Sequence, residues 1–268
     1  MNIKIRPICG VAVLLSVIFL IFISPAKSAS QPSDSKLVEI LAFEYPPFIK
    51  GDGTGIGERI VTAALQPQGY TVKFLYYPHK RAVINFRDGE GQLHIGIRKS
   101  FSEQEIDGEK ISYFRRVFVY LKKQYPDFQM KTLDDLKGKR IGVTLGSSQA
   151  DELKDAGLTL DESTIPENNM KKLYAGRTDV FYTPDLTALS MIDKLFPGQF
   201  SEFGIVEYKR DSADLIVRKN SPGENILQSY RTGLKMIIES GTYHRILEDF
   251  YGAGRVPDSA KVTSSEIR

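Results

Sequence analysis

Apolar positions recur with strand and helix periods from residue 37 onward. A largely apolar run at 37–43 is typical of a buried strand, and residues 58–66 carry apolar side chains at helical spacing. Alternation at 70–77 predicts a strand, 81–86 a helix, and 93–97 another strand. This alternating order predicts a layered α/β domain.

A second pattern of the same kind follows an extended segment at 117–121. It opens with a capped helical turn at 132–138 that ends in a glycine. The further elements expected are a strand at 140–144, helices at 149–156 and 169–175, a strand at 179–182 and a helix at 184–195. A second α/β unit is therefore predicted.

The last third of the chain returns to a strand followed by helices. Residues 214–219 predict a strand, 226–238 a long amphipathic helix, and 242–250 a final helix before Gly252. The segment beyond Pro257 is polar, and we expect it to be disordered.

The first residues have the pattern of an export signal. Lys4 and Arg6 precede an almost wholly apolar run at 8–23, and small residues follow up to Ala29. This predicts a cleavable signal peptide at 1–29 and an exported protein. The alternative is an uncleaved anchor, but the run is shorter than the roughly 20 residues that a membrane span needs.

Removing the leader changes the composition. The single cysteine, Cys9, is lost, so the exported protein has no disulfide to form. The net charge of +3 falls to about zero, because Lys4, Arg6 and Lys27 leave with no acidic residue. A nucleic-acid-binding role is not expected without a basic stripe. Roughly 240 residues remain, enough for one large or two modest domains.

Candidate chemistry begins at Glu44-Tyr45-Pro46-Pro47-Phe48. The two prolines end the first strand and hold two rings and a carboxylate near its carboxyl end, where open α/β sheets bind ligands. The alternative is a proline turn whose rings belong to the core. The glycine-rich segment 51–57 lacks the spacing of both nucleotide-binding fingerprints and predicts a flexible loop.

The order of these segments resembles the bacterial extracellular solute-binding protein family 3, the periplasmic receptors of polar amino acid ABC importers. The resemblance is carried by Tyr45-Pro46-Pro47-Phe48, Gly55, and residues 133–143, 175–180, 215–219 and 241–252. It implies a type II periplasmic binding protein fold: two α/β lobes, joined by two crossing strands, that close around a ligand. Lobe 1 would comprise residues 36–118 and 214–254, lobe 2 residues 119–213, and 255–268 would form a polar tail.

The chain departs from the family where amino acids are usually held. The slot of the arginine that binds the ligand carboxylate falls on Glu105, and that of the aspartate that binds the ammonium falls on Pro184. The resemblance therefore implies that the ligand is not a standard α-amino acid, or that Arg98 is the carboxylate clamp. The alternative is a register error between Lys99 and Lys110.

The predicted ligand-binding residues are Glu44, Tyr45, Phe48, Arg81, Arg98, Ser100, Ser147, Ser148, Thr183 and Asp185. Alternatives stay open for several of them. Arg81 also suits a solvated helix start, and Ser147 and Ser148 suit simple helix caps.

The functional hypothesis is a monomeric periplasmic receptor that presents a small solute to a membrane partner, with an ABC importer permease as the expected partner. We expect no catalytic residue, no metal and no cofactor, since three scattered histidines make no metal motif. Two alternatives are a periplasmic sensory ligand-binding protein without importer, and a cleft enzyme of the cyclohexadienyl dehydratase type with Glu105 as general acid.

Overall fold

The computed structural model describes Met1 and residues 36–268. The predicted signal peptide, apart from Met1, and the leader at 30–35 lie outside the described residues. Asp34–Arg268 form one compact unit, and the description below concerns that unit alone. No helix in this described part of the chain is long and apolar enough to cross a membrane.

Eight strands form one mixed sheet in the order β2-β1-β3-β8-β4-β7-β5-β6. The strands are β1 (Lys36–Ala42), β2 (Tyr70–Tyr76), β3 (Leu93–Gly96), β4 (Ile106–Leu121), β5 (Ile141–Thr144), β6 (Leu160–Ser163), β7 (Val180–Pro184) and β8 (Phe203–Arg218). The outer strands on each side run parallel to their neighbours, as in an α/β protein.

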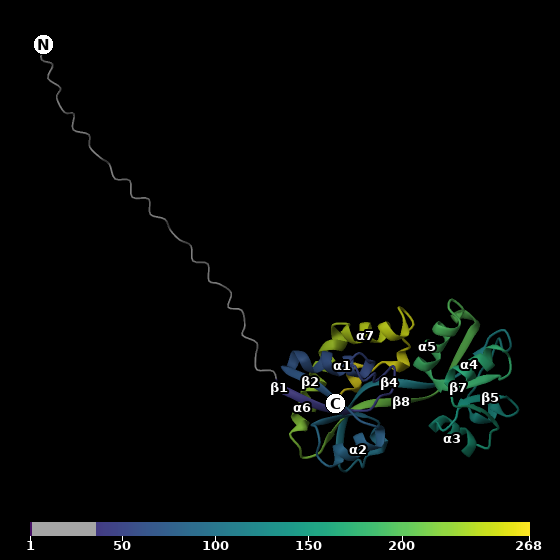
Figure 1. The fold of residues 1–268 in the computed structure, drawn as a ribbon, viewed down its shortest axis with the longest axis horizontal. Coiled ribbons are helices and arrows are strands. Elements are labelled where there is room, and N and C mark those ends of the chain that lie inside the picture. Colours follow the sequence, from purple (N-terminus) through teal and green to yellow (C-terminus); the bar gives the residue numbers. More distant parts are fainter. Residues whose placement is uncertain (2–35) are drawn as a thin grey trace. The chain divides into compact units, whose positions relative to one another are not determined.

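Seven α-helices cover this sheet. They are α1 (Ile56–Leu65), α2 (His79–Arg87), α3 (Ser148–Asp155), α4 (Pro166–Tyr174), α5 (Asp185–Leu195), α6 (Gly223–Glu239) and α7 (Thr242–Tyr251). Figure 1 shows α1, α2, α6 and α7 gathered around β1 and β2, and α3, α4 and α5 gathered around β5 and β7.

Two long antiparallel strands join these groups. β4 and β8 pair from Ile106 opposite Arg218 to Leu121 opposite Phe203, with irregular register next to Ser112 and Val117. The molecule therefore has two α/β lobes connected by two crossing strands (Figure 1). We call the group with β1–β3 the first lobe and the group with β5–β7 the second lobe.

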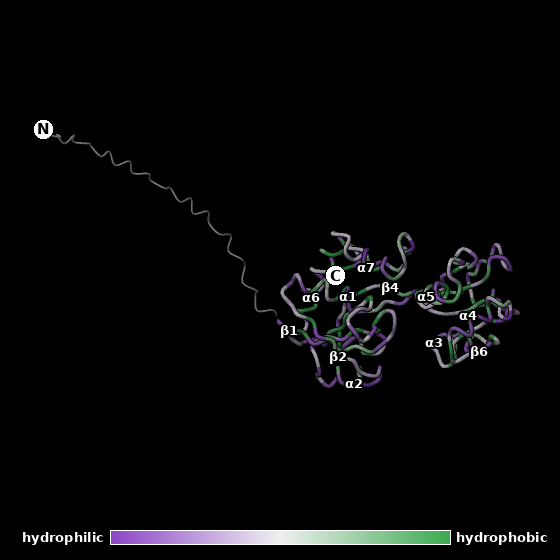
Figure 2. Tube along the Cα trace, turned by 45° about the horizontal axis from the view of Figure 1, so that its top comes forward, coloured by the Kyte–Doolittle hydropathy of each residue, from purple (hydrophilic) through white to green (hydrophobic). Residues whose placement is uncertain are grey.

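Each lobe has its own apolar interior. The larger cluster contains β1, α1, α6 and α7 side chains, and separate clusters lie on the two sides of the sheet in the second lobe. In the first lobe, a Cβ at Gly233 would lie 1.9 Å from the Ala64 carbonyl oxygen, so this glycine allows α6 to pack directly on α1. Apolar stretches, green in Figure 2, run through both lobes.

The expected strands and helices are present, with three differences. β4 and β8 each begin well before the predicted segments 117–121 and 214–219, because their first halves alternate poorly and carry many charged residues. The short strand β6 was not predicted, because only one of its four residues is apolar.

The prediction of a disordered polar tail is wrong. Ala260, Val262 and Ile267 are buried against the first lobe, and the Val262 amide donates to the Tyr243 hydroxyl at 3.1 Å. The prediction relied on the polar composition of the tail. Three buried apolar side chains are enough to hold this irregular segment against the first lobe, although they follow neither a helical nor a strand period.

Candidate functional site

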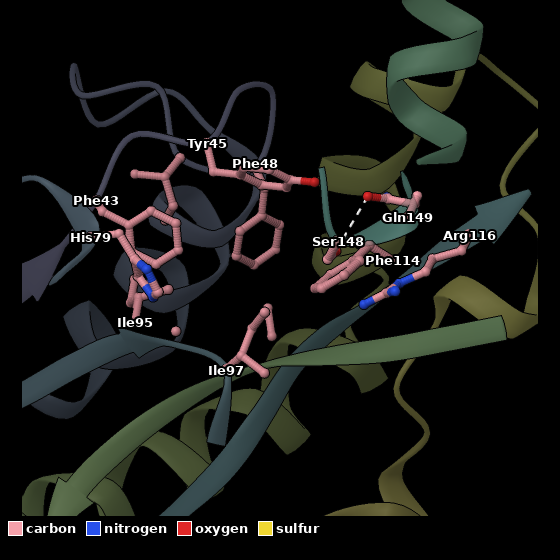
Figure 3. A pocket seen from close by; sticks show the side chains of 13 residues that line it. Phe43, Tyr45, Phe48, His79, Ile95, Ile97, Phe114, Arg116, Ser148 and Gln149 are labelled. Atoms are coloured by element: carbon pink, nitrogen blue, oxygen red, sulfur yellow. Dashed lines mark hydrogen bonds between the residues drawn. The ribbon is translucent and has the colours of Figure 1, made fainter. Parts of the chain in front are cut away.

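A cavity of about 310 Å³ lies beside the crossing strands and takes its lining from both lobes. It is lined by Phe43, Tyr45, Phe48, Ile49, His79, Ile95, Gly96, Ile97, Phe114, Arg116, Ser148, Gln149 and Ala213 (Figure 3). The loop after β1, α2 and β3 contribute from the first lobe, α3 from the second, and β4 and β8 from the connection. This size falls at the lower end for small-molecule sites.

Aromatic side chains form most of the wall. The Phe43 ring lies 4.5 Å from the His79 ring, and the Tyr45 ring lies 6.4 Å from that of Phe114. Phe48 reaches the cavity from the proline turn, and a Cβ at Gly57 would lie 2.7 Å from its ring. The absence of a side chain at Gly57 therefore lets Phe48 sit back on α1 and leaves the cavity open.

The loop behind Phe48 is held by a buried carboxylate. Glu58 accepts hydrogen bonds from the amides of Lys50, Gly53 and Gly55 at 3.0, 3.2 and 2.7 Å, and from the Tyr76 hydroxyl. Burial, together with this bond to Glu58, raises the pKa of Tyr76. The glycine-rich segment is therefore a fixed loop wrapped around a carboxylate, which corrects the prediction of a flexible one.

Arg116 is the cation of the cavity, and carboxylates already surround it. Its Nε lies 2.7 Å from Asp211, and its Nη1 lies 3.4 Å from Glu152. Glu152 also accepts from the Tyr182 hydroxyl at 2.9 Å and from Lys209. Burial acts to raise the pKa of Glu152, but these hydrogen bonds lower it overall, so Glu152 is ionised at neutral pH.

The second lobe contributes the start of α3. The Ser147 hydroxyl accepts from the Ala150 amide at 3.2 Å and donates to the Thr144 carbonyl at 2.7 Å, so it caps the helix. Ser148 and Gln149 follow and line the cavity, with the Ser148 hydroxyl 3.3 Å from the Gln149 side-chain oxygen. Figure 3 shows the Tyr45 hydroxyl directed toward these two residues.

The Tyr45 hydroxyl is a donor at neutral pH. Desolvation, opposed by the Arg116 charge, raises its pKa, although 42% of the residue as a whole is exposed. The cavity thus presents neutral polar groups at one end and rings along its sides.

Of the ten residues predicted to bind ligand, Tyr45, Phe48 and Ser148 line this cavity. Glu44 and Arg81 are exposed: Glu44 borders a neighbouring shallow hollow, and Arg81 lies over the Tyr77 ring. Ser147 serves as the helix cap described above.

Arg98 and Ser100 are not part of the cavity lining. Arg98 donates to the Glu103 carboxylate at 3.2 Å and to the Gly108 carbonyl at 3.3 Å. The Ser100 carbonyl accepts from Arg87 at 2.7 Å. Glu105, the residue in the family's arginine slot, lies in a surface groove outside the cavity.

Thr183 and Asp185 are buried outside the cavity lining as well. Asp185 has no exposed surface and accepts from Arg115 at 2.8 Å, from Tyr251 at 2.8 Å and from the Leu186 amide at 2.8 Å. Thr183 lies in β7 opposite Val117. These three hydrogen bonds of Asp185 join it to other groups of the protein itself.

The sequence reading missed His79, Phe114, Arg116 and Gln149. The available signal was the strand period, because Phe114 and Arg116 are two residues apart in β4 and share one face. That signal was lost when the strand was predicted to begin at Val117. No group of histidine, cysteine and acidic side chains suited to a metal occurs among the described residues.

Comparisons with known proteins agree on the fold. No family model matches the chain. The L-cystine-binding protein TcyJ of Escherichia coli is 28% identical over 126 residues, which are 46% of this chain and 46% of that protein. The chain thus spans about half the length of the curated relatives it matches.

Two solved structures extend the likeness to most of the chain. The unliganded open L-cystine solute receptor of Neisseria gonorrhoeae matches with a TM-score of 0.64 and 19% identity, covering 84% of this chain and 98% of that one. A histidine kinase sensor domain similar to periplasmic binding proteins matches with a TM-score of 0.56 and 17% identity, covering 82% and 98%. The two-lobed binding-protein fold is confirmed, and so is the resemblance to the family 3 solute-binding proteins.

Proposed function

We propose that this protein is a periplasmic receptor that captures a small solute in the cavity between its lobes. The observation that carries the proposal is a cavity lined by rings from the first lobe, by the start of α3 from the second, and by Arg116 on a connecting strand. The names of its relatives, including an L-cystine-binding protein, support solute binding.

The physical basis is differential affinity for the closed state. Neither lobe alone surrounds a ligand, so a solute that contacts both lobes stabilises the arrangement in which they approach. The proposed lobes are 36–118 with 214–254, and 119–213, with the signal peptide at 1–29 directing export.

The proposed site is narrower than the ten predicted residues. It keeps Tyr45, Phe48 and Ser148 and adds Phe43, His79, Phe114, Arg116 and Gln149. The proposed ligand is not a standard α-amino acid, because Arg98 and Asp185 are bound to other protein groups and do not line the cavity.

The partner is proposed to be a membrane protein, an importer permease in the first instance. A sensory role is the second candidate, and the likeness to a histidine kinase sensor domain favours it. The dehydratase hypothesis loses its candidate acid, because Glu105 lies outside the cavity.

The test is native mass spectrometry of protein purified from the periplasm, followed by solution scattering. We expect a small molecule to accompany the protein, and the radius of gyration to fall when that molecule is returned to stripped protein. Matched variants sharpen the test: Phe114→Ala in the cavity should lose the contraction, and Phe128→Ala on the second lobe should keep it. A protein that carries no solute and never contracts with any metabolite mixture would refute the receptor.

A further inference from the structure

We infer that the cavity selects a neutral aromatic solute with one uncharged polar end. This inference rests on the proposed receptor function and names its ligand class. It follows from three features: the rings of the wall, the neutralised cation, and the uncharged groups at the α3 end.

The wall favours a flat apolar body. Phe43, Phe48 and Phe114 present rings to the cavity, and Ile95 and Ile97 complete its sides (Figure 3). Aromatic pairs gain about 0.5–1.5 kcal/mol beyond the area they bury when rings lie offset or edge to face. A planar ring therefore uses this lining better than a branched or extended polar chain.

Among the described residues that line the cavity, an anionic solute meets no lysine or arginine that lacks a carboxylate partner. Arg116 is 18% exposed and lies between the carboxylates of Asp211 and Glu152, which are 15% and 16% exposed. A ligand carboxylate that took Arg116 would leave Asp211, which is poorly solvated, with only the exposed Lys99 at 3.7 Å, and weakening such a pair is unfavourable. A free acid would therefore have to compete with two protein carboxylates for Arg116.

The described lining of the cavity also offers no charge partner to a cationic solute. Among the described residues that line the cavity, none is an aspartate or glutamate. Asp185, one residue beyond the family's ammonium-binding slot, is held by Arg115 and Tyr251. An α-amino acid would therefore find neither of its two usual charge partners.

The polar end has uncharged partners. The Tyr45 and Ser148 hydroxyls and the Gln149 side-chain amide converge at the α3 side of the cavity (Figure 3). Together they donate and accept hydrogen bonds without carrying charge, which suits an amide, alcohol or carbonyl group. Because Ser148 and Gln149 belong to the second lobe, the polar end of the solute would be the part that couples binding to closure.

The chain offers a clean assay because it contains no tryptophan. Indole fluorescence can be excited where tyrosine does not absorb, so its anisotropy reports only the probe. Four probes share the ring and differ in charge: indole-3-acetamide is neutral, indole-3-acetate anionic, tryptamine cationic and tryptophan zwitterionic. We expect the amide to bind at least about tenfold more tightly than each of the other three.

One variant should weaken the preference for the neutral probe over the anionic one. Asp211→Asn frees Arg116 from its closest carboxylate, and we expect it to tighten indole-3-acetate about tenfold while changing indole-3-acetamide little. Asp193→Asn is the matched control, because Asp193 pairs with Arg255 outside the cavity lining and its loss should leave the order of the four probes unchanged. Circular dichroism of both variants verifies that they fold.

Two results would overturn the ligand class. If the native protein binds indole-3-acetate as tightly as indole-3-acetamide, the inference that the solute is neutral is contradicted. If none of the four probes binds, the inference that the solute is aromatic is contradicted. If either result occurs while a co-purified solute still makes the protein contract, the proposed receptor function is kept and the inferred ligand class is rejected. If no solute makes the protein contract, the receptor function itself is rejected.

Discussion

At the scale of single residues, the buried His94 predicts that the stability of the protein depends on pH. It is 1% exposed, and its ring lies 5.5 Å from that of Phe86 and 5.3 Å from that of Phe101. No hydrogen bond of ordinary geometry from the described residues reaches either ring nitrogen. Burial, helped by the nearby His79, lowers the pKa of His94 to about 3.

The prediction follows from the sign of that change. Between about pH 6.5 and pH 3, His94 is protonated in the unfolded chain but stays neutral in the folded protein. The free energy of unfolding therefore falls as the pH is lowered. Lowering the pH by one unit in that window reduces the free energy of unfolding by about 1.4 kcal/mol. His94→Leu should remove this one-proton dependence, as measured by urea unfolding at several pH values; an unchanged slope in the variant would contradict the assignment.

At the scale of elements, α5 is tied to the first lobe through its first residue. Asp185 begins α5 and accepts from Tyr251 at the end of α7 and from Arg115 on β4. Leu186 and Leu189 of α5 pack in the core cluster of the first lobe, and Arg255 pairs with Asp193 of α5 at 3.1 Å. One helix of the second lobe therefore rests on the last helix of the first, beside the crossing strands.

Tyr251→Phe tests this contact. The variant leaves the buried Asp185 carboxylate one donor short, so we expect a loss of about 1–3 kcal/mol in the free energy of unfolding. Tyr70→Phe is the control, since within the described part of the chain its hydroxyl makes a single 3.4 Å contact, with Ser229, and its loss should change stability by less than about 0.5 kcal/mol. Denaturant unfolding measures both, and equal losses in the two variants would argue against a special role for Asp185.

At the scale of the whole molecule, the proposed ligand binding in the cavity predicts an effect on stability. A solute held by both lobes binds the folded chain alone, so it must raise the free energy of unfolding. Indole-3-acetamide at a hundred times its dissociation constant should add about 2.7 kcal/mol. Thermal unfolding with and without the probe measures this, and Phe114→Ala should show a much smaller increase at the same concentration. A probe that binds without stabilising the protein would place its site elsewhere.

The sequence predicted the elements of the molecule better than its site. Strands such as β2 and helices such as α6 follow from local periodicity, which depends on neighbouring residues only. Tyr45 and Phe48 were found because prolines mark the end of a strand. The sequence did not show that Arg98 and Asp185 already have partners within the protein, because those partners, Gly108, Arg115 and Tyr251, are set by strand pairing and lobe packing rather than by spacing along the chain.

By itself the sequence determined the order of the helices and of the strands other than β6, the aromatic turn after the first strand and the presence of two α/β units, since each is encoded in short-range patterns of apolar residues, prolines and glycines. Only the tertiary structure decided which charged groups are free and which are already paired. It brought Asp211 of β8 and Glu152 of α3 to Arg116 of β4, and it buried an apparently polar tail. The reason is that a charge's availability depends on its neighbours in space, and those neighbours come from segments far apart in the chain.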